Sequence, residues 1–341
     1  MKRPDSAMLQ PRKLAERALD VLVVSDMCAD LVVTGNVRPK NQRVSQVISD
    51  YSLEVGGSAN IFASQLAKLG GRVGVIGYVG ADIVGDYALK ELARIGVDTT
   101  RVKKHPTAKT GIGLHLAEKN YRAMLTYLGS IDVTRSKDLD DALLDTCRHW
   151  HLASYFVLSG LRTFWPHWLW KCRKAGVTTS LDTNWDHSER WDGVTELLPY
   201  TDVFLPSEAE ALSITGETDV WRAATRLAGC GPLVVVKCGE KGAIATKGSE
   251  RWRVESSDAD ALPLTVVDTA GVGDNFNAGF IRSWLLGHDI EFSLRLGRDC
   301  ALSSLRSRGG IRGQLRQFVG KETVLSRGAS LMKNKDPRKS R

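Results

Sequence analysis

The sequence predicts an α/β protein, in which a mostly parallel sheet is covered by helices on both faces and a second, smaller sheet stands apart. From residue 150 onward, short apolar β-like runs alternate with runs of helical periodicity, which is typical of such a parallel sheet. Before residue 130, several β-like runs follow one another without helices between them. A glycine-rich turn near residue 270 then joins a β-like run to a helix.

The first half of the chain supplies the start of the main sheet and all of the smaller one. Residues 43–55 are rich in Val, Ile, Ser and Tyr, as half-exposed strands are. Gly56 and Gly57 then break the chain before a run with helical apolar spacing. We expect strands at 21–25, 31–35, 43–55 and 73–76, helices at 59–69 and 86–95, and a hairpin at 111–118 and 122–128. Residues 31–55 and 109–128 should form a small sheet that projects from the main domain.

The second half continues the main sheet, with strands and helices in alternation. We expect strands at 150–157, 178–181, 203–205 and 233–237, and helices at 165–175, 208–215 and 220–228. A β-like run at 264–267 precedes the glycine turn, and a last helix should cover 275–286.

Polar clusters follow these strands at their carboxyl ends, where ligands bind in open α/β sheets. One such cluster is commonplace, because every loop needs turn residues and an N-cap, and Asp182 alone would be interpreted as a cap. An ordinary turn explains the Gly56 segment equally well, and it is the favoured explanation of the Gly239 segment. Clusters at successive strand ends nevertheless predict a shared cleft. They are Asp26 with Asp30, Gly56 with Gly57, Asp182 with Asn184, Ser207 with Glu210, Gly239 with Gly242, and the last turn with Asp274.

The last glycine turn carries the most specific chemistry. Gly271 and Gly273 bracket a turn that ends on Asp274 and opens a helix. Free N–H groups and the helix dipole favour an anion such as phosphate there. A carboxylate beside a bound anion is unfavourable unless it takes a proton. A general base next to a phosphate cradle is what a kinase needs to activate a hydroxyl nucleophile.

Composition and charge place limits on partners. The chain has 341 residues, 43% of them hydrophobic, and a net charge of +8. Residues 1–13 contribute +3 and residues 331–341 contribute +4, so the body carries only about +1 by subtraction. We expect a disordered basic leader at 1–18, one folded domain at 19–318 and a disordered basic tail at 319–341. The nearly neutral body argues against nucleic-acid binding.

The cysteines indicate the compartment. Six cysteines are scattered without a Cys-x-x-Cys pair, which indicates reduced thiols in a cytoplasmic protein and argues against structural zinc. No run of about 18 apolar residues is present, so no membrane span is predicted.

These motifs resemble the ribokinase-like carbohydrate kinases, also called the phosphofructokinase B family. The segment Asp268-Thr-Ala-Gly-Val-Gly-Asp-Asn-Phe-Asn-Ala-Gly-Phe280 closely matches the C-terminal signature of that family. Gly56-Gly57 with Leu69-Gly70 matches the glycines of the N-terminal signature, and Val236-Lys-Cys-Gly-Glu-Lys-Gly242 is similar to the nucleotide-side loop. The resemblance covers about residues 20–315 and implies a three-layer α/β/α domain with a β-sheet lid.

The resemblance also implies roles for individual residues. Asp274 would be the base, and the N–H groups of Gly271, Val272 and Gly273 would form the anion hole. Substrate positions would be Asp30, Gly56, Gly57, Asn60 and Asp274. ATP positions would be Ser207, Glu210, Lys237, Gly239, Gly242, Gly271 and Gly273. Glu210 would help to place Mg²⁺ through water, and Asp268 with the Ala270 carbonyl matches a monovalent-cation site, for K⁺, found in some members.

Two positions depart from the family pattern. The asparagine of the N-terminal signature is replaced by Ile61, with Asn60 one place early, and the asparagine of the Asn-x-x-Glu motif is Ser207. Loss of an amide at position 61 would alter the sugar contacts. Serine has a shorter reach, so metal or phosphate handling would differ. Neither change touches the expected base.

The sequence therefore predicts an ATP-dependent kinase that transfers the γ-phosphoryl group to a hydroxyl of a sugar or sugar-like substrate. A non-catalytic sugar or nucleoside sensor and a nucleoside kinase stay as alternatives, because the acceptor is not specified by these motifs. Exposed lid strands would gain from pairing with a second subunit, so a homodimer through the lid is expected.

Overall fold

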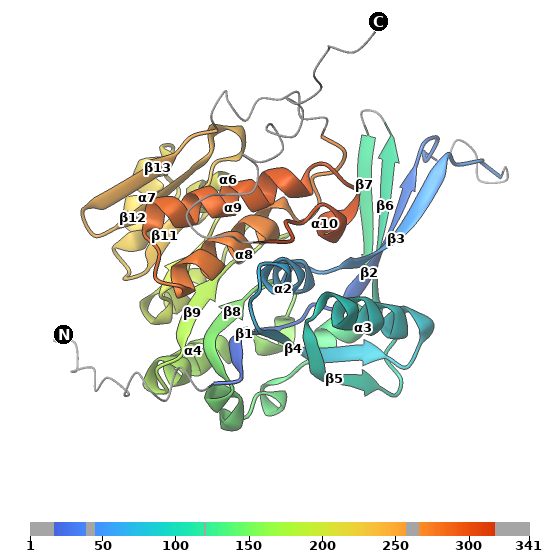
Figure 1. Ribbon diagram of the computed structural model, residues 1–341, viewed down its shortest axis with the longest axis horizontal. Coiled ribbons are helices and arrows are strands. Elements are labelled where there is room, and N and C mark those ends of the chain that lie inside the picture. The colour runs from blue at the N-terminus through green and yellow to red at the C-terminus, as the bar shows by residue number, and fades with distance from the viewer. Residues whose placement is uncertain (1–16, 39–44, 119–120, 257–265, 318–341) are drawn as a thin grey trace, which may run out of the picture.

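The computed structural model describes residues 17–38, 45–118, 121–256 and 266–317. The expected basic tail at 319–341 lies outside the described residues, as does the expected leader except for its last two residues. Figure 1 shows a sheet between two layers of helices, with a smaller sheet projecting on one side. The α/β/α fold with a lid is thereby confirmed.

The central sheet has nine strands within the described residues, and most of its pairs are parallel. Parallel pairing runs from β11 to β5, whereas β12 and β13 are antiparallel additions at one edge. In spatial order the strands are β13 (Glu250–Val254), β12 (Ala243–Lys247), β11 (Leu233–Lys237), β10 (Val203–Phe204), β9 (Thr178–Leu181), β8 (Cys147–Leu152), β1 (Leu19–Val24), β4 (Val73–Gly80) and β5 (Asp98–His105).

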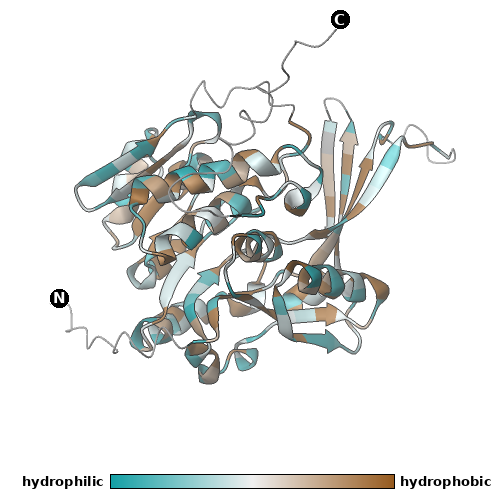
Figure 2. Ribbon diagram, viewed as in Figure 1, coloured by the Kyte–Doolittle hydropathy of each residue, from teal (hydrophilic) through white to brown (hydrophobic). Residues whose placement is uncertain are grey.

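Two apolar cores lie on the opposite faces of this sheet. Strand β1 shows why, because alternate side chains point to opposite faces: Leu22 and Val24 belong to one core, and Val21 and Val23 to the other. The first core is covered by α4 (Trp165–Lys174), α5 (Val194–Leu197), α6 (Glu208–Thr215) and α7 (Val220–Ala228). The second is covered by α2 (Ser58–Lys68), α3 (Ile83–Ile95), α8 (Val272–Leu285) and α9 (Ile290–Ser304). The helices in Figure 2 carry both hydrophobic and hydrophilic residues, as expected for elements buried on one side.

The lid is a separate sheet of four strands within the described residues. Its order is β3 (Asp50–Gly56), β2 (Cys28–Thr34), β6 (Gly111–Glu118) and β7 (Tyr121–Tyr127). The pairs β2–β3 and β6–β7 are antiparallel, and the central pair β2–β6 is parallel. Residues 25–27 lead from β1 of the main sheet into β2, and the turn at Gly57 leads from β3 into α2. The four lid strands project from the main domain, but residues 45–49 of the expected strand at 43–55 are irregular.

Several elements differ from the sequence expectations. Strands β5, β12 and β13 and helix α9 are additional, and α8 begins at Val272 rather than at residue 275. The expected strand at 264–267 is wrong for Val266 and Val267, which are irregular and exposed, and its first two residues lie outside the described residues. The Val267 N–H donates to the Leu305 carbonyl at 2.8 Å, and neither valine pairs with a strand among the described residues.

Short helices complete the described chain. They are α10 (Gly309–Arg312), η1 (Gly129–Val133), η2 (Ser136–Asp138), η3 (Asp141–Asp145), η4 (Ser159–Leu161), η5 (Leu198–Tyr200) and η6 (Gly239–Lys241). Among the helices in the described ranges, none is long and apolar enough to cross a membrane.

Candidate active site

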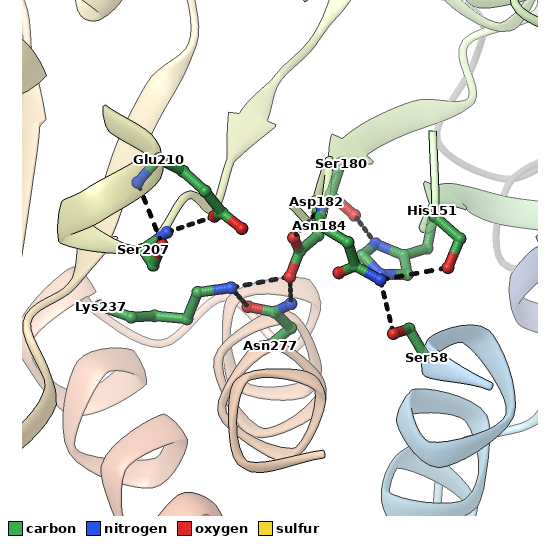
Figure 3. A network of polar contacts seen from close by, with 10 residues as sticks. Ser58, His151, Ser180, Asp182, Asn184, Ser207, Glu210, Lys237 and Asn277 are labelled. Carbon is green, nitrogen blue, oxygen red and sulfur yellow. Dashed lines mark hydrogen bonds and ion pairs between the residues drawn. The ribbon is translucent and has the colours of Figure 1, made fainter. Parts of the chain in front are cut away.

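A buried ion pair lies where the carboxyl ends of β9 and β11 meet the start of α8 (Figure 3). The Lys237 ammonium donates to Oδ2 of Asp182 at 2.7 Å and to Oδ1 of Asn277 at 3.3 Å. Asn277 also donates to Asp182. Burial alone would raise the pKa of Asp182, but the Lys237 charge and these hydrogen bonds hold it below its usual range. Burial would likewise lower the pKa of Lys237, but the charges of Asp182 and Glu210 hold it high.

Asp274 stands in the first turn of α8, beside this pair. The first backbone N–H groups of a helix have no acceptor within the helix, and here they belong to Val272, Gly273 and Asp274. A Cβ added at Gly273 would lie 3.5 Å from the Lys237 ammonium nitrogen, so the cation lies beside this anion-binding turn. Burial and the Asp182 charge raise the pKa of Asp274 well above its usual range, whereas Lys237 acts in the opposite direction.

Gly271 holds the turn in a shape that other residues resist. Its φ is +68°, in the left-handed region that favours glycine. An added Cβ would also lie 2.8 Å from two carbons of Ile61 and 3.1 Å from the Gly310 Cα. Ile61 therefore supports the back of the anion-binding turn.

Asp26 fixes the start of α2 against the same cleft. Its carboxylate accepts the N–H groups of Ser58 at 2.9 Å and Ala59 at 3.1 Å, and the Ser154 hydroxyl at 2.6 Å. The Ser58 side chain in turn hydrogen-bonds to Asp274 and accepts a hydrogen bond from the Asn184 amide at 2.6 Å. Helix α2 is thus tied to the expected base through short polar side chains.

Asp30 lies at the root of the lid, over two glycines. A Cβ at Gly56 or Gly113 would come within 2.4 Å of its carboxylate, so a side chain at either position would displace Asp30. His115 lies 3.3 Å from Oδ1 of Asp30, and this contact raises the pKa of His115. Next to them, a cavity of about 210 Å³ opens between the lid and the segment that contains Asp268.

Gly56 at the end of β3 and Gly57 after it are held from within the protein by Asn60. The Asn60 side chain is fully buried, donates to the Gly56 carbonyl at 2.7 Å and accepts the Ser25 hydroxyl at 2.7 Å. Gly57 has a φ of +89°, and a Cβ there would lie 2.4 Å from the Asp26 carbonyl oxygen. Asn60 therefore holds the turn from behind, and its amide is used within the protein.

The loops after β10 and β11 bound the other side of the cleft. Ser207 and Glu210 cap α6 reciprocally: the Ser207 N–H donates to Glu210 at 2.7 Å, and the Glu210 N–H donates to the Ser207 hydroxyl at 3.2 Å. Burial and the Asp182 charge raise the pKa of Glu210. Gly239 and Gly242 both have positive φ, and a Cβ at Gly242 would lie 2.0 Å from the Val254 carbonyl oxygen.

Comparisons with known proteins identify the family and the fold. The family model described as "pfkB family carbohydrate kinase" matches residues 18–316. The chain belongs to the pfkB family of carbohydrate kinases. It is 31% identical to the fructoselysine 6-kinase of Shigella flexneri over 74% of this chain and 90% of that protein. It is 28% identical to the cytidine kinase of Thermococcus kodakarensis over 82% of this chain and 97% of that protein. A candidate ribokinase II from E. coli, solved with ATP and Mg²⁺, has a similar fold, with a TM-score of 0.75 at 24% identity over 87% of this chain and 96% of that one.

The pfkB family member has no preformed metal cage in the part of the chain that the structure describes, since no group of three or more His, Cys, Asp or Glu side chains could hold an ion. Glu210 is a buried carboxylate at this site, and Mg²⁺ carried by a nucleotide needs only one or two carboxylates besides water and phosphate. At the expected monovalent-cation position, Asp268 accepts the Ala270 N–H at 3.1 Å and the Gly309 N–H at 3.0 Å.

The site of this kinase also contains residues to which the sequence motifs assign no catalytic or binding role. Asp182 could pass for a helix cap, and Asn277 lies inside a predicted helix, yet both bind Lys237. Ser58 and Ser154 give no sequence signal at all. For Asp182, the available signal was its place at a strand end together with the lysine at the end of β11.

Two buried histidines lie beneath the site of this kinase. His149 and His151 each approach the Ser180 hydroxyl at 2.7 Å, and His151 stacks on Phe62 with 3.9 Å between ring centroids. Burial lowers the pKa of His151 to about 3 and that of His149 well below its usual value. The pair is therefore neutral and structural at physiological pH.

Proposed function

We propose that this kinase transfers the γ-phosphoryl group of ATP to a hydroxyl of a sugar or sugar-like substrate, with Asp274 as general base. The observation that carries the proposal is the buried Asp274 carboxylate in the first turn of α8, next to free N–H groups and Lys237. A carboxylate with a raised pKa is a better proton acceptor than an ordinary aspartate. The N–H groups of Gly271, Val272 and Gly273 stabilise charge that develops on the transferred group.

We place ATP on the side of the cleft formed by Lys237, Gly239 and Gly242. The two glycines let the backbone approach the nucleotide closely, and Lys237 contacts its phosphates as a point charge. Glu210, oriented by Ser207, would hold Mg²⁺ through water. When bound with ATP, Mg²⁺ neutralises phosphate charge. The Asp268 and Ala270 segment stays a proposed K⁺ site.

We place the acceptor under the lid, against Asp30, Gly56 and Gly57. Asp30 can accept hydrogen bonds from sugar hydroxyls, and the glycines leave room for a ring near the start of α2. Asn60 stays a proposed substrate position; its amide already donates one hydrogen bond to the Gly56 carbonyl and accepts one from the Ser25 hydroxyl. Two relatives are named fructoselysine 6-kinase and cytidine kinase. A sugar conjugate and a nucleoside are therefore both candidate acceptors for this kinase.

A panel of acceptors tests the proposal. ATP consumption is measured with ribose, fructose, fructoselysine, 2-dehydro-3-deoxygluconate and cytidine, each with K⁺ and with Na⁺. Acceptor-dependent ADP formation with a phosphorylated product supports phosphoryl transfer, and faster turnover in K⁺ supports the cation site. Acceptor binding without ADP formation across the panel would instead indicate a sensor.

We also propose that two copies pair through their lids. The lid exposes apolar side chains, with Tyr51 67%, Met124 57%, Leu125 62% and Tyr127 51% accessible. An exposed apolar sheet is a template for association. Light scattering of the wild type and of Leu125→Lys should show a dimer and a monomer, respectively, whereas a monomeric wild type at micromolar concentration would contradict the pairing.

A further inference from the structure

A second cavity, of about 540 Å³, lies behind the lid and away from the proposed active site. Its walls are the end of β3, the last residue of α2, the outer part of α3, and the segment at and after α10. None of the proposed substrate, ATP or metal residues lines it. Any ligand of this cavity must therefore be inferred from the residues that line it.

Cations outnumber carboxylates in this cavity. Arg312 is neutralised by Glu54 at 2.8 Å, and Arg94 by Glu91 at 2.8 Å. Lys68 and Arg316 also line the cavity, and neither has a carboxylate partner among the described residues. Within the described part of the chain, two positive charges in one concave site are thus left without a counter-ion.

The geometry holds Lys68 in place. Its ammonium nitrogen donates to the Ile311 carbonyl at 2.6 Å. Burial, together with the charges of Arg316 and Arg94, lowers the pKa of Lys68 to about 8. Burial is the larger cause of this shift and the neighbouring arginines add to it, so a bound anion would stabilise the charged form of Lys68.

We propose that this cavity binds a small multivalent oxyanion, either a phosphate compound or a polycarboxylate. Arginine side chains bind both groups in a bidentate manner, and lysine adds a point charge. The volume of about 540 Å³ falls within the range of small-molecule sites.

The cavity is connected to the active site through α10. The Gly309 N–H donates to Asp268 at 3.0 Å, and the Gly310 carbonyl accepts the Asn275 amide at 2.9 Å. At the other end of α10, Arg312 binds Glu54 of lid strand β3 at 2.9 Å. An anion held by Lys68 and Arg316 therefore bears on the segment that contacts both the anion-binding turn and the lid.

Calorimetry on the magnesium-free full-length protein tests the binding. Sodium pyrophosphate and sodium citrate are titrated separately at constant ionic strength, into the wild type and into Lys68→Met/Arg316→Gln. The double variant should bind at least one anion about tenfold more weakly, which corresponds to losing one good charged contact. Preference for pyrophosphate would identify a phosphate ligand, and preference for citrate a polycarboxylate.

The matched control removes two exposed cations elsewhere, Lys174→Met/Lys247→Met, and should bind as the wild type does. Thermal melting of both double variants shows whether they are folded. Equal affinity of the wild type and Lys68→Met/Arg316→Gln for both anions would overturn the proposal. No substrate is used, so this outcome is independent of whether the protein proves to be a phosphotransferase.

Hydrogen exchange tests the connection. Pyrophosphate or citrate should slow exchange in residues 50–56 and 309–316 of the wild type at least twofold, and not in Lys68→Met/Arg316→Gln. Pyrophosphate bound at the α8 turn instead would protect residues 271–275 equally in both proteins, which would count against a role for the second cavity.

Discussion

The ammonium nitrogen of Lys237 lies 2.7 Å from Oδ2 of Asp182, and the two side chains are only 14% and 4% accessible. A buried pair of this kind is costly to break, because the partner left behind is an uncompensated charge. Glu210 and Asp274 both contribute to the field at Lys237. This lysine therefore stabilises three carboxylates as well as facing the proposed phosphate position.

Replacing Lys237 should separate stability from nucleotide binding. Lys237→Met should lower the free energy of unfolding by about 3–5 kcal/mol, because Asp182 loses its counter-ion. Asp182→Asn/Lys237→Met should recover much of that stability and still bind ATP weakly. Urea denaturation and ATP titration measure the two effects. Equal ATP affinity of the double variant and the wild type would rule out a phosphate contact by Lys237.

Replacing Asp274 tests the proposed base. Asp274→Asn should reduce kcat by about 10²-fold or more, the effect of losing general-base catalysis. Because burial and the Asp182 charge raise the pKa of Asp274, its ionised form destabilises the fold, and the amide should melt at the same or a higher temperature. Steady-state kinetics and thermal melting provide both readouts. Near-normal turnover in a folded variant would refute the mechanism.

The anion-binding turn should tolerate no side chain at Gly271. Gly271→Ala combines an unfavourable positive φ, about 1–2 kcal/mol, with contacts of 2.8 Å to Ile61. Gly96→Ala is the matched control, since Gly96 has a φ of +101° and nothing within 4 Å of an added Cβ. Urea denaturation should show a larger loss of unfolding free energy for Gly271→Ala than for Gly96→Ala. An equal loss of stability in the two variants would mean that the Ile61 side chain can move away from the added Cβ without destabilising the fold.

The buried histidines should make the protein acid-sensitive. His149 and His151 are neutral when folded and gain protons when unfolded below pH 6.5, so the unfolded state binds more protons. Stability is complete above pH 6.5 and falls as the pH drops toward 3, by about 1.4 kcal/mol per pH unit for each histidine.

Asp26 and Asp274, whose pKa values are raised, have the opposite effect on stability. Their protonation at low pH favours the folded state, so their contribution to stability rises as the pH falls. The histidine effect is therefore isolated by comparing urea denaturation of the wild type with His149→Gln/His151→Gln at pH 7 and pH 5. The variant should lose less stability between the two pH values. A variant with the same pH dependence would exclude the histidines as its cause.

Local sequence predicted correctly the helices and strands whose secondary structure does not depend on contacts with distant segments. Residues 178–181, 208–215, 220–228 and 233–237 form strands and helices at the expected bounds. The run at 264–267 has equal β character, but Val266 and Val267 find no strand to pair with. In the opposite sense, β13 and β5 become strands because an open sheet edge lies beside them.

The sequence by itself determined the alternation of strands and helices, the glycine turn and the place of Asp274 at the start of α8, since spacing and glycine content specify these locally. Only the tertiary structure decided that Asp182 pairs with Lys237, 55 residues away. It also placed Ile61 behind Gly271 and turned Asn60 inward. Contacts of this kind depend on which segments the sheet brings together, and burial then decides the charge of each carboxylate.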